Sequence, residues 1–468
     1  MRQTLAREVT NLLERGRDRQ LRLAVTGLSR AGKTAFLTSL VNQLRHAGLE
    51  ARLDLMACAR EGRLLGARRV AQQDLAVPRF PYDEAMAALD ETPPRWPDPT
   101  RGISELRLQI RYRPGRHGLL GMVAADSATL TLDLFDYPGE WLLDLPLLEH
   151  DFLSWSERQQ AALTPARREL AADWLEAVAD LTPDAAADEA ELAAIAERYA
   201  ATLRAAREAG FADLQPGRFL LPGDLAGAPV LQFFPLPGIG EADRQALEAL
   251  PEDSVYHTLS RRFAHYQQHV VKPFYREHFR RFDRQIVLVD VLGALNAGPE
   301  RFEDLSRALA TLMRSFHYGK RSLVSRLFAP RIDRLAIAAT KADHVTPEQH
   351  TNLVTLLEAL LAEPIQDLRF ADIPVKALSL ASIRATQSRE VERQGRRFPA
   401  LRGTTQAGEE ALLFPGEVPA QIPEADFWQR QGFTFDHFRP LPRDARGDAL
   451  PHIRLDAALD WLIGDKLA

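Results

Sequence analysis

The stretch GLSRAGKT, from Gly27 to Thr34, has the residue types of a phosphate-binding loop. It fits G-x-x-x-x-G-K-[ST], in which two glycines let successive backbone N–H groups turn toward phosphate oxygens. Lys33 would reach the β- and γ-phosphates of a nucleotide, and the Thr34 hydroxyl would bind Mg²⁺. The alternative is an ordinary strand-to-helix turn, but the apolar run before it and the helical pattern after it favour the loop. The residues expected to contact the nucleotide are Gly27, Ser29, Arg30, Ala31, Gly32, Lys33, Thr34 and Ala35.

A phosphate loop requires a second Mg²⁺-associated carboxylate at the end of another strand. TLTLDLFDYPGE ends in Asp136-Tyr137-Pro138-Gly139, a D-x-x-G pattern. Asp136 would steady the ion and the Gly139 N–H would sense the γ-phosphate. Glu140 follows, where G proteins carry the Gln that orients the attacking water. Glu140 could therefore act as a base, face away so that hydrolysis is slow, or be an exposed turn charge.

A third element should recognise the base. Thr340-Lys341-Ala342-Asp343 directly follows the apolar run LAIAA and resembles N/T-K-x-D. The Asp343 carboxylate would accept hydrogen bonds from guanine N1 and N2, which adenine cannot supply, so discrimination would be large. Ser382, after the run KALSL, is a candidate in a base-contacting loop.

The remaining catalytic candidates lie between the phosphate loop and Asp136. Thr100 precedes a predicted strand and could reach Mg²⁺ as a switch residue, or could be an ordinary turn threonine. Arg30 and Arg101 could act as arginine fingers from within the chain, although an exposed position is the ordinary one for each. Lys33, Thr100 and Glu140 are thus the catalytic candidates, and Thr34, Thr100 and Asp136 the metal ligands.

Composition limits the classes of function. The 468 residues carry a net charge of −5, which argues against general nucleic-acid binding. A single cysteine excludes a disulfide framework within the chain and favours a reducing compartment. We find no signal peptide and no apolar run of the ~18 residues that span a membrane. The expected location is cytoplasmic.

The elements that position these motifs are predicted by hydrophobic pattern. Apolar runs over 21–27, 104–112, 127–136, 284–292, 333–340 and 372–380 indicate strands separated by helices. We therefore predict an α/β fold, a mostly parallel sheet with helices on both faces. Together with the phosphate-loop and D-x-x-G motifs, this is the P-loop NTPase, G-protein-like type of fold. The predicted parts are an amphipathic helix (1–20), the core (21–141 and 284–402), a helical insertion (142–283), and a C-terminal loop and packing helix (403–468).

Taken together, the chain resembles the YcjX family of bacterial P-loop nucleotide hydrolases. The resemblance rests on TGLSRAGKTAFLTSLVNQL, FDYPGEWLLDLPLL, VDVLGALNAG and TKADHV. It implies a GTPase-like core with a large helical insertion, an association with stress responses, and a peripheral contact or protein partner at the inner membrane. One departure from ordinary G proteins is Thr340, where Asn usually ties this loop to the phosphate loop.

Three functions follow from these motifs. The first is a switch that binds and hydrolyses GTP with Mg²⁺, in which the insertion reports the nucleotide state because it directly follows the D-x-x-G loop. The second is an ATPase or small-molecule kinase. The third is a nucleotide-gated binding module with negligible turnover.

Overall fold

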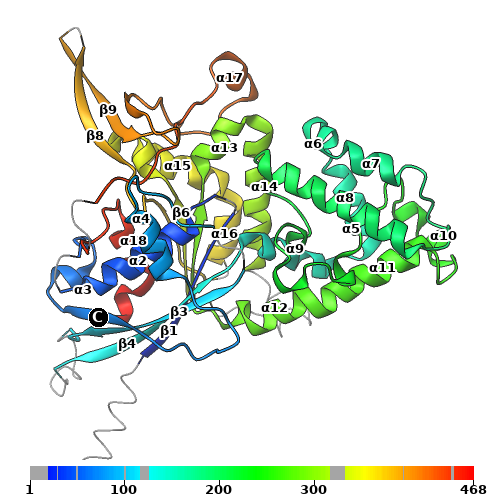
Figure 1. Cartoon of the computed structure of the whole chain (residues 1–468), viewed down its shortest axis with the longest axis horizontal. Coiled ribbons are helices and arrows are strands. Elements are labelled where there is room, and N and C mark those ends of the chain that lie inside the picture. Colours follow the sequence, from blue (N-terminus) through cyan, green and yellow to red (C-terminus); the bar gives the residue numbers. More distant parts are fainter. Residues whose placement is uncertain are drawn as a thin grey trace, which may run out of the picture. The chain divides into compact units, whose positions relative to one another are not determined.

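The computed structural model describes residues 19–28, 30–48, 51–99, 102–115, 126–316, 332–370, 372–393, 395–443 and 447–468. The chain forms two compact units (Figure 1). The first contains the described residues up to Tyr137, the segment Phe282–Gly298 and the described residues from 332 onward. The second contains Pro138–Arg281 and a segment that begins at Pro299.

These limits differ from the predicted ones in three ways. The second unit begins at Pro138 rather than 142, and it takes in a second stretch of chain from Pro299. The C-terminal part, 403–468, belongs to the first unit. The helix predicted over 1–20 falls outside the described residues, except that Arg19 and Gln20 begin a strand.

A seven-stranded sheet organises the first unit, in the order β2-β3-β4-β1-β5-β6-β7. The five strands from β4 to β7 run parallel, while β2 and β3 pair antiparallel at one edge. β5 is buried along its whole length, as expected for a strand covered on both faces. The strands are β1 (Arg19–Gly27), β2 (Leu64–Val70), β3 (Ser104–Tyr112), β4 (Ala128–Asp136), β5 (Arg284–Val289), β6 (Arg334–Ala339) and β7 (Val375–Ser379).

Two differences from the predicted strands affect the site. The run over 284–292 is strand only to Val289, and helix α13 (Val291–Ala297) begins two residues later. Asp290 ends the strand because its carboxylate accepts a hydrogen bond from Gly293 N at 3.0 Å, which caps the helix. β2 was not predicted, since only its first residue, Leu64, is fully buried.

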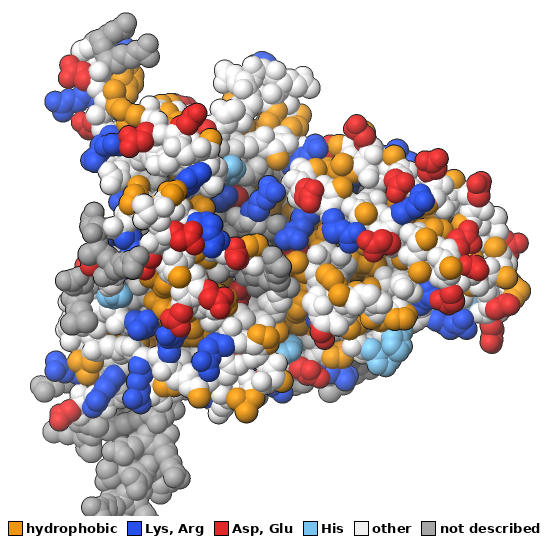
Figure 2. Space-filling view, in the orientation of Figure 1, with side chains coloured by type: hydrophobic (Ala, Val, Ile, Leu, Met, Phe, Trp, Pro, Cys, Tyr) orange, Lys and Arg blue, Asp and Glu red, His pale blue; other side chains and the backbone are white. Residues whose placement is uncertain are grey.

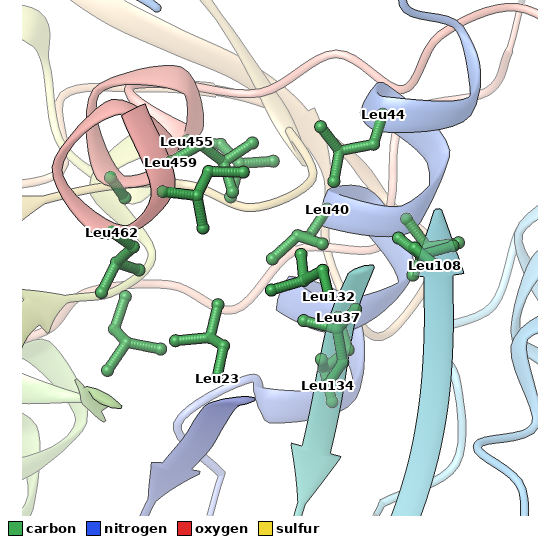
Figure 3. Close-up of a cluster of buried hydrophobic side chains, with 14 of the residues drawn as sticks. Leu23, Leu37, Leu40, Leu44, Leu108, Leu132, Leu134, Leu455, Leu459 and Leu462 are labelled. Atoms are coloured by element: carbon green, nitrogen blue, oxygen red, sulfur yellow. The ribbon is translucent and has the colours of Figure 1, made fainter. Parts of the chain in front are cut away.

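Leucine side chains form the core on one face of this sheet (Figure 3). Leu23 of β1 and Leu132 of β4 lie beneath helix α2 (Lys33–Arg45), which contributes Leu40. Helix α18 (Leu455–Ile463) covers the same face through Leu459 and its neighbours. Both helices therefore pack on the face of the sheet that includes β1, the strand before the predicted phosphate loop.

Helix α15 (His350–Leu360) packs on β6 and β7. Ala336 and Ala338 of β6 belong to the leucine core, so Leu335 and Ile337 point to the opposite side of the sheet. Helices thus cover both faces, as predicted. The other helices of this unit are α3 (Ala57–Arg60), α4 (Tyr82–Leu89), η9 (Ala342–His344), η10 (Pro347–Gln349), α16 (Ala362–Phe370), α17 (Ala425–Arg430) and η11 (Gly464–Lys466).

Arg284 fixes the C-terminal end of α18 to the sheet. It is 1% exposed at the start of β5 and donates to Leu462 O at 2.6 Å. Its other nitrogens donate to Asp333 Oδ1 at 2.7 Å and Asp465 Oδ2 at 2.7 Å. A buried guanidinium requires such partners, so this network holds the helix in place.

A second, three-stranded antiparallel sheet follows β7, in the order β10-β9-β8. Its strands are β8 (Thr386–Arg393), β9 (Arg396–Thr404) and β10 (Glu410–Leu413). The sequence pattern indicated none of them, because most of their described side chains are exposed and apolar residues do not alternate.

In the described part of the second unit, the regular elements are helices joined by irregular segments, and the β-structure is an isolated bridge between Ala186 and Ser254. An aromatic cluster forms its centre, where Trp155 stacks on Phe263 at 5.0 Å and meets Phe233 at 5.5 Å. On the face shown in Figure 2, acidic and basic side chains of this unit are interspersed with apolar ones. The helices are η2 (Gly139–Glu149), α5 (Phe152–Ala161), α6 (Pro165–Leu170), α7 (Ala172–Val178), α8 (Glu189–Glu208), α9 (Gly217–Leu220), η3 (Gly223–Leu225), η4 (Pro229–Leu231), η5 (Glu241–Asp243), α10 (Arg244–Glu248), α11 (Val255–Tyr266), η6 (Gln267–Val271), α12 (Lys272–Glu277), η7 (Phe279–Arg281) and α14 (Pro299–Ser315).

None of the helices in the described part of the chain has the length and apolar character needed to cross a membrane.

Candidate functional site

The predicted phosphate loop joins the end of β1 to the start of α2. A Cβ at Gly27 would lie 2.6 Å from the carbonyl oxygen of Leu288 on the neighbouring strand, so only glycine fits there. Arg30 and Gly32 have φ angles of 63° and 82°, and these left-handed residues turn the chain into the helix. Ser29 lies outside the described residues.

The N-terminus of α2 is open to an anion. Gly32 is its N-cap residue, and no side chain caps the helix. The first N–H groups of a helix lack partners within it and carry partial positive charge, which favours a phosphate. Lys33 Nζ donates to Gly27 O at 2.7 Å, so the lysine arches back over its own loop. Ala31 is buried, whereas Arg30 is exposed.

Asp136 lies at the same edge of the sheet as this loop. β4 runs parallel to β1 with Asp136 beside Val25, two residues before Gly27. Thr34, in the first turn of α2, is 9% exposed and Asp136 is 2% exposed. Their oxygens are hard ligands of the kind Mg²⁺ prefers, and this ion usually takes one or two carboxylates plus substrate phosphates. The residues present therefore fit a Mg²⁺–nucleotide.

Among the residues that the structure describes, no group of three or more His, Cys, Asp or Glu could hold a metal ion. Thr100 and Arg101, the predicted switch threonine and its neighbouring arginine, lie outside those residues.

The predicted base-recognition loop follows β6, which is two strands from β1. Thr340 Oγ1 donates to Val289 O at 3.3 Å, so its hydroxyl ties the loop to the end of β5. Lys341 has a φ of 59° and its Nζ forms an ion pair with Asp290 Oδ2. Burial opposes the ionisation of Asp290, but the charge and hydrogen bond of Lys341 outweigh it, and the pKa of Asp290 lies below its usual value.

Asp343 is oriented by the chain that follows β7. It is 3% exposed, and its Oδ2 accepts a hydrogen bond from Ala385 N at 2.5 Å. Its Oδ1 lies 4.0 Å from His344 Nε2. Thr386 Oγ1 donates to the Asp343 carbonyl, which holds the backbone of both segments together. The carboxylate thus has a fixed direction before any ligand is present.

Ser382 lies in the loop that supplies this hydrogen bond. It is 8% exposed, and Ala381 beside it exchanges two hydrogen bonds with Ile453, at 3.0 and 2.8 Å. Ala342 N donates to Leu380 O at 3.1 Å. The structure therefore brings Ser382 and the Thr340–Asp343 loop together at one edge of the sheet.

Gly139 and Glu140 belong to the second unit. They begin η2, a 3₁₀ helix of 11 residues, although 3₁₀ runs longer than about four residues are uncommon. Glu140 is buried, with Oε1 3.7 Å from an Arg207 guanidinium nitrogen. Neither carboxylate oxygen has a hydrogen-bond partner among the described residues. Within this unit Glu140 is therefore neither an exposed turn charge nor hydrogen-bonded.

A second carboxylate lies one turn further along η2. Asp144 accepts hydrogen bonds from Tyr266 Oη at 2.5 Å and Gly217 N at 2.7 Å. Burial raises the pKa of Asp144 to about 6, against the lowering effect of those two hydrogen bonds. A Cβ at Gly217 would lie 2.0 Å from the carbonyl oxygen of Glu140, so α9 approaches η2 as closely as glycine allows.

Sequence reasoning missed two residues beside the predicted nucleotide-binding loops. Asp290 lies in the stretch VDVLGALNAG, where an Asp after a buried strand and three residues before a Gly is typical of a helix cap. His344, directly after Asp343, has its Nδ1 2.9 Å from Asp436 O. The position of His344 directly after the T-K-x-D motif is the feature of the sequence that could have pointed to it.

Comparison with known proteins agrees with this arrangement. A model of the YcjX-like family, DUF463, matches residues 21–467. The chain belongs to the YcjX-like family. It is 50% identical over 464 residues to an Escherichia coli protein named Ras-like GTPase YcjX, with 99% of each chain covered. A protein of the same name from Shewanella oneidensis is 46% identical over 470 residues, covering 98% of this chain and 96% of the relative.

Membership of the YcjX-like family confirms the predicted resemblance and the predicted fold class. The fold is a G-protein-like P-loop sheet, mostly parallel, with helices on both faces and a large helical unit inserted after β4.

Proposed function

We propose that this member of the YcjX-like family binds and hydrolyses GTP with Mg²⁺ and acts as a conformational switch. The observation that carries the proposal is the fixed Asp343 carboxylate, which shares one edge of the sheet with the phosphate loop. Guanine offers N1 and N2 donors to a carboxylate, and adenine offers none at those positions. GTP and GDP are therefore preferred to ATP.

At the phosphate end, Lys33 leaves Gly27 O and pairs with the β- and γ-phosphates. The open N–H groups of α2, together with those of the loop residues from Gly27 to Ala35, including Ser29, surround the phosphate oxygens. Thr34 and Asp136 hold Mg²⁺, with Thr100 as the proposed third ligand. When bound, the ion neutralises the charge that develops on the transferred phosphoryl group.

The nucleotide base would be bound by the loop that contains Lys341 and Asp343. The two side chains have different roles there. Asp343 selects guanine through its carboxylate. Lys341 is held by Asp290, so its aliphatic stem has a defined position beside the base. Thr340 supports the loop through Val289 O instead of through the phosphate loop, and Ser382 contributes from the adjoining segment.

The switch is supported by where the two units meet along the chain. The boundary falls between Tyr137 and Pro138, within the D-x-x-G sequence. Asp136 therefore ends a strand of the first unit, while Gly139 and Glu140 begin η2 of the second. A γ-phosphate that orders this loop would act directly on the first element of the helical unit.

Glu140 favours a second candidate function, a nucleotide-gated binding module with negligible turnover. Its carboxylate lies beside Arg207 of its own unit. If it keeps that contact when GTP binds, no base activates the water, and hydrolysis is slow without help from a partner. If the protein is instead a hydrolysing switch, the Glu140 carboxylate leaves Arg207 and accepts a proton from the attacking water.

The test is phosphate release from Mg²⁺-GTP and Mg²⁺-ATP by wild type and Lys33→Ala. We expect GTP turnover that disappears with Lys33. The control is Lys272→Ala, because Lys272 lies in the second unit, where its Nζ donates to Gln268 Oε1 at 2.6 Å, and it belongs to none of the proposed nucleotide-binding loops. GTP binding without release would support the binding module. ATP turnover at an equal or greater rate would contradict guanine selection and favour an ATPase or kinase.

The stress-response role and the inner-membrane partner implied by the family resemblance stay predictions.

A further inference from the structure

A short C-terminal segment, Gly432–Phe438, lies beside the proposed nucleotide site. Asn296 of α13 holds it by two hydrogen bonds, from Phe435 N to Oδ1 and from Nδ2 to Phe435 O, each 2.8 Å. His344 holds it from the base-recognition loop through Asp436 O at 2.9 Å. The segment is therefore anchored to the chain that follows β5 and to the chain that follows β6.

Neighbouring contacts fix the segment further. Trp96 Nε1 donates to Phe438 O at 2.8 Å, and Gln406 N donates to His437 O at 3.1 Å. The Phe438 ring is buried and meets the His344 ring edge-on at 5.3 Å. The backbone on both sides of His437 thus has a defined position.

The His437 side chain is exposed and lies next to the predicted base-recognition loop. Its ring meets the His344 ring at 6.2 Å, one residue from Asp343. Partial desolvation by its neighbours, and then the charge of Lys341, lower the pKa of His437. Asp290 and Arg30 also act on this imidazole electrostatically. Groups from the phosphate loop, the end of β5 and the base loop therefore all lie near His437.

We propose that His437 binds the ribose hydroxyls of the nucleotide. The inference rests on the proposed function, because a nucleotide with its phosphates at Gly32 and its base at Asp343 places its sugar between those two loops. A neutral imidazole carries one N–H donor and one acceptor nitrogen. A ribose hydroxyl needs both, whereas a phosphate would need donors alone.

Within the described residues, the nitrogens of the His437 ring are available to hydrogen-bond a ligand. The ring makes no hydrogen bond to any residue in the described part of the chain. Asp290, the acidic group near it, is already engaged with Lys341 and Gly293. His437 is thus a binding residue supplied by a part of the chain, 403–468, in which the sequence showed only a loop and a packing helix.

The experiment is calorimetric titration with Mg²⁺-GDP and with its 2′,3′-dideoxy analogue, for wild type and His437→Ala. Loss of one hydrogen bond should weaken GDP binding roughly fivefold. The dideoxy analogue should bind both proteins equally, because it lacks the hydroxyls. His437→Gln, which keeps a donor and an acceptor, should recover part of the affinity for GDP.

Two further variants serve as comparisons: one removes the anchor of the His437 segment, and the other removes a histidine far from it in the chain. Asn296→Ala removes both hydrogen bonds to Phe435 and should reproduce the loss seen with His437→Ala. His265→Ala, in the second unit, should bind as wild type. An equal loss for GDP and the dideoxy analogue, or no loss for either, would overturn the role of His437 while leaving GDP binding established. Failure of wild type to bind GDP would overturn the proposed function and this inference with it.

Discussion

Replacing Asp343 by Asn tests base recognition with little change to the fold. The Asn carbonyl oxygen can keep the hydrogen bond from Ala385 N, which Asp343 Oδ2 now accepts at 2.5 Å. The amide –NH₂ group then stands at the position of Oδ1, and a donor faces the N1 and N2 donors of guanine. The substitution therefore replaces an acceptor that matches the guanine N1 and N2 donors with a donor that opposes them.

The expected loss follows from the hydrogen bonds involved. A hydrogen bond to a charged group contributes about 1.5–3 kcal/mol, so two of them to guanine amount to roughly 3–6 kcal/mol. Because each 1.4 kcal/mol is tenfold, GDP should bind at least ~100-fold more weakly. Xanthine carries an acceptor at C2, so the –NH₂ group can donate to it, and XDP should bind the variant better than GDP.

The assay is competition between GDP and XDP for wild type and Asp343→Asn, with a melting temperature for each protein. The melting temperatures should agree closely, since the bond to Ala385 is retained. Similar weakening of GDP and XDP, in a protein that still melts as wild type, would refute the argument that this carboxylate reads guanine.

Three further substitutions test the packing around the site. Arg284→Leu removes the guanidinium that bonds Asp465, and should cost about 3 kcal/mol, seen as a lower melting temperature; an unchanged value would show that the network adds no stability. Burial, and then the charge of Asp133, raises the pKa of Glu105 to about 7, above its usual 4.5, so its contribution to stability falls as pH rises through that range. Glu105→Gln should therefore gain stability relative to wild type between pH 5 and pH 8 in thermal melts, and a constant difference would contradict this. Gly217→Ala places a Cβ 2.0 Å from a backbone oxygen and should lower the melting temperature by several degrees, whereas a neutral result would mean that η2 moves freely.

The sequence predicts the six apolar strands and the motifs that follow three of them because both signals are local. A buried strand needs a continuous apolar run, and parallel strands bring their carboxyl ends to one edge. Gly27, Asp136 and Thr340 could therefore be placed together once the strands were recognised. Strands β8 and β9 carry polar residues on both sides, and β10 is only four residues long, so no periodicity marks them.

What the sequence could not supply are contacts between distant residues. Nothing near Glu140 in the chain indicates that Arg207 would lie 3.7 Å from it. Likewise, the approach of His437 to the base loop depends on Asn296 and His344, which bond its neighbours from two separate elements. Such pairings are set by topology, and they decide which of the open alternatives for a side chain is realised.

The central position of β1 has a consequence for how the protein is made. β1 pairs with β4 on one side and with β5 on the other, and the whole of Pro138–Arg281 lies between those two partners in the chain. Arg22 N bonds Asp283 Oδ2 across 261 residues. At about 5–20 residues per second, a ribosome needs roughly 10–50 s to bring β5 out after β1. Until β5 emerges, at least one edge of this apolar strand is unpaired, and such an edge is a site at which a nascent chain can aggregate.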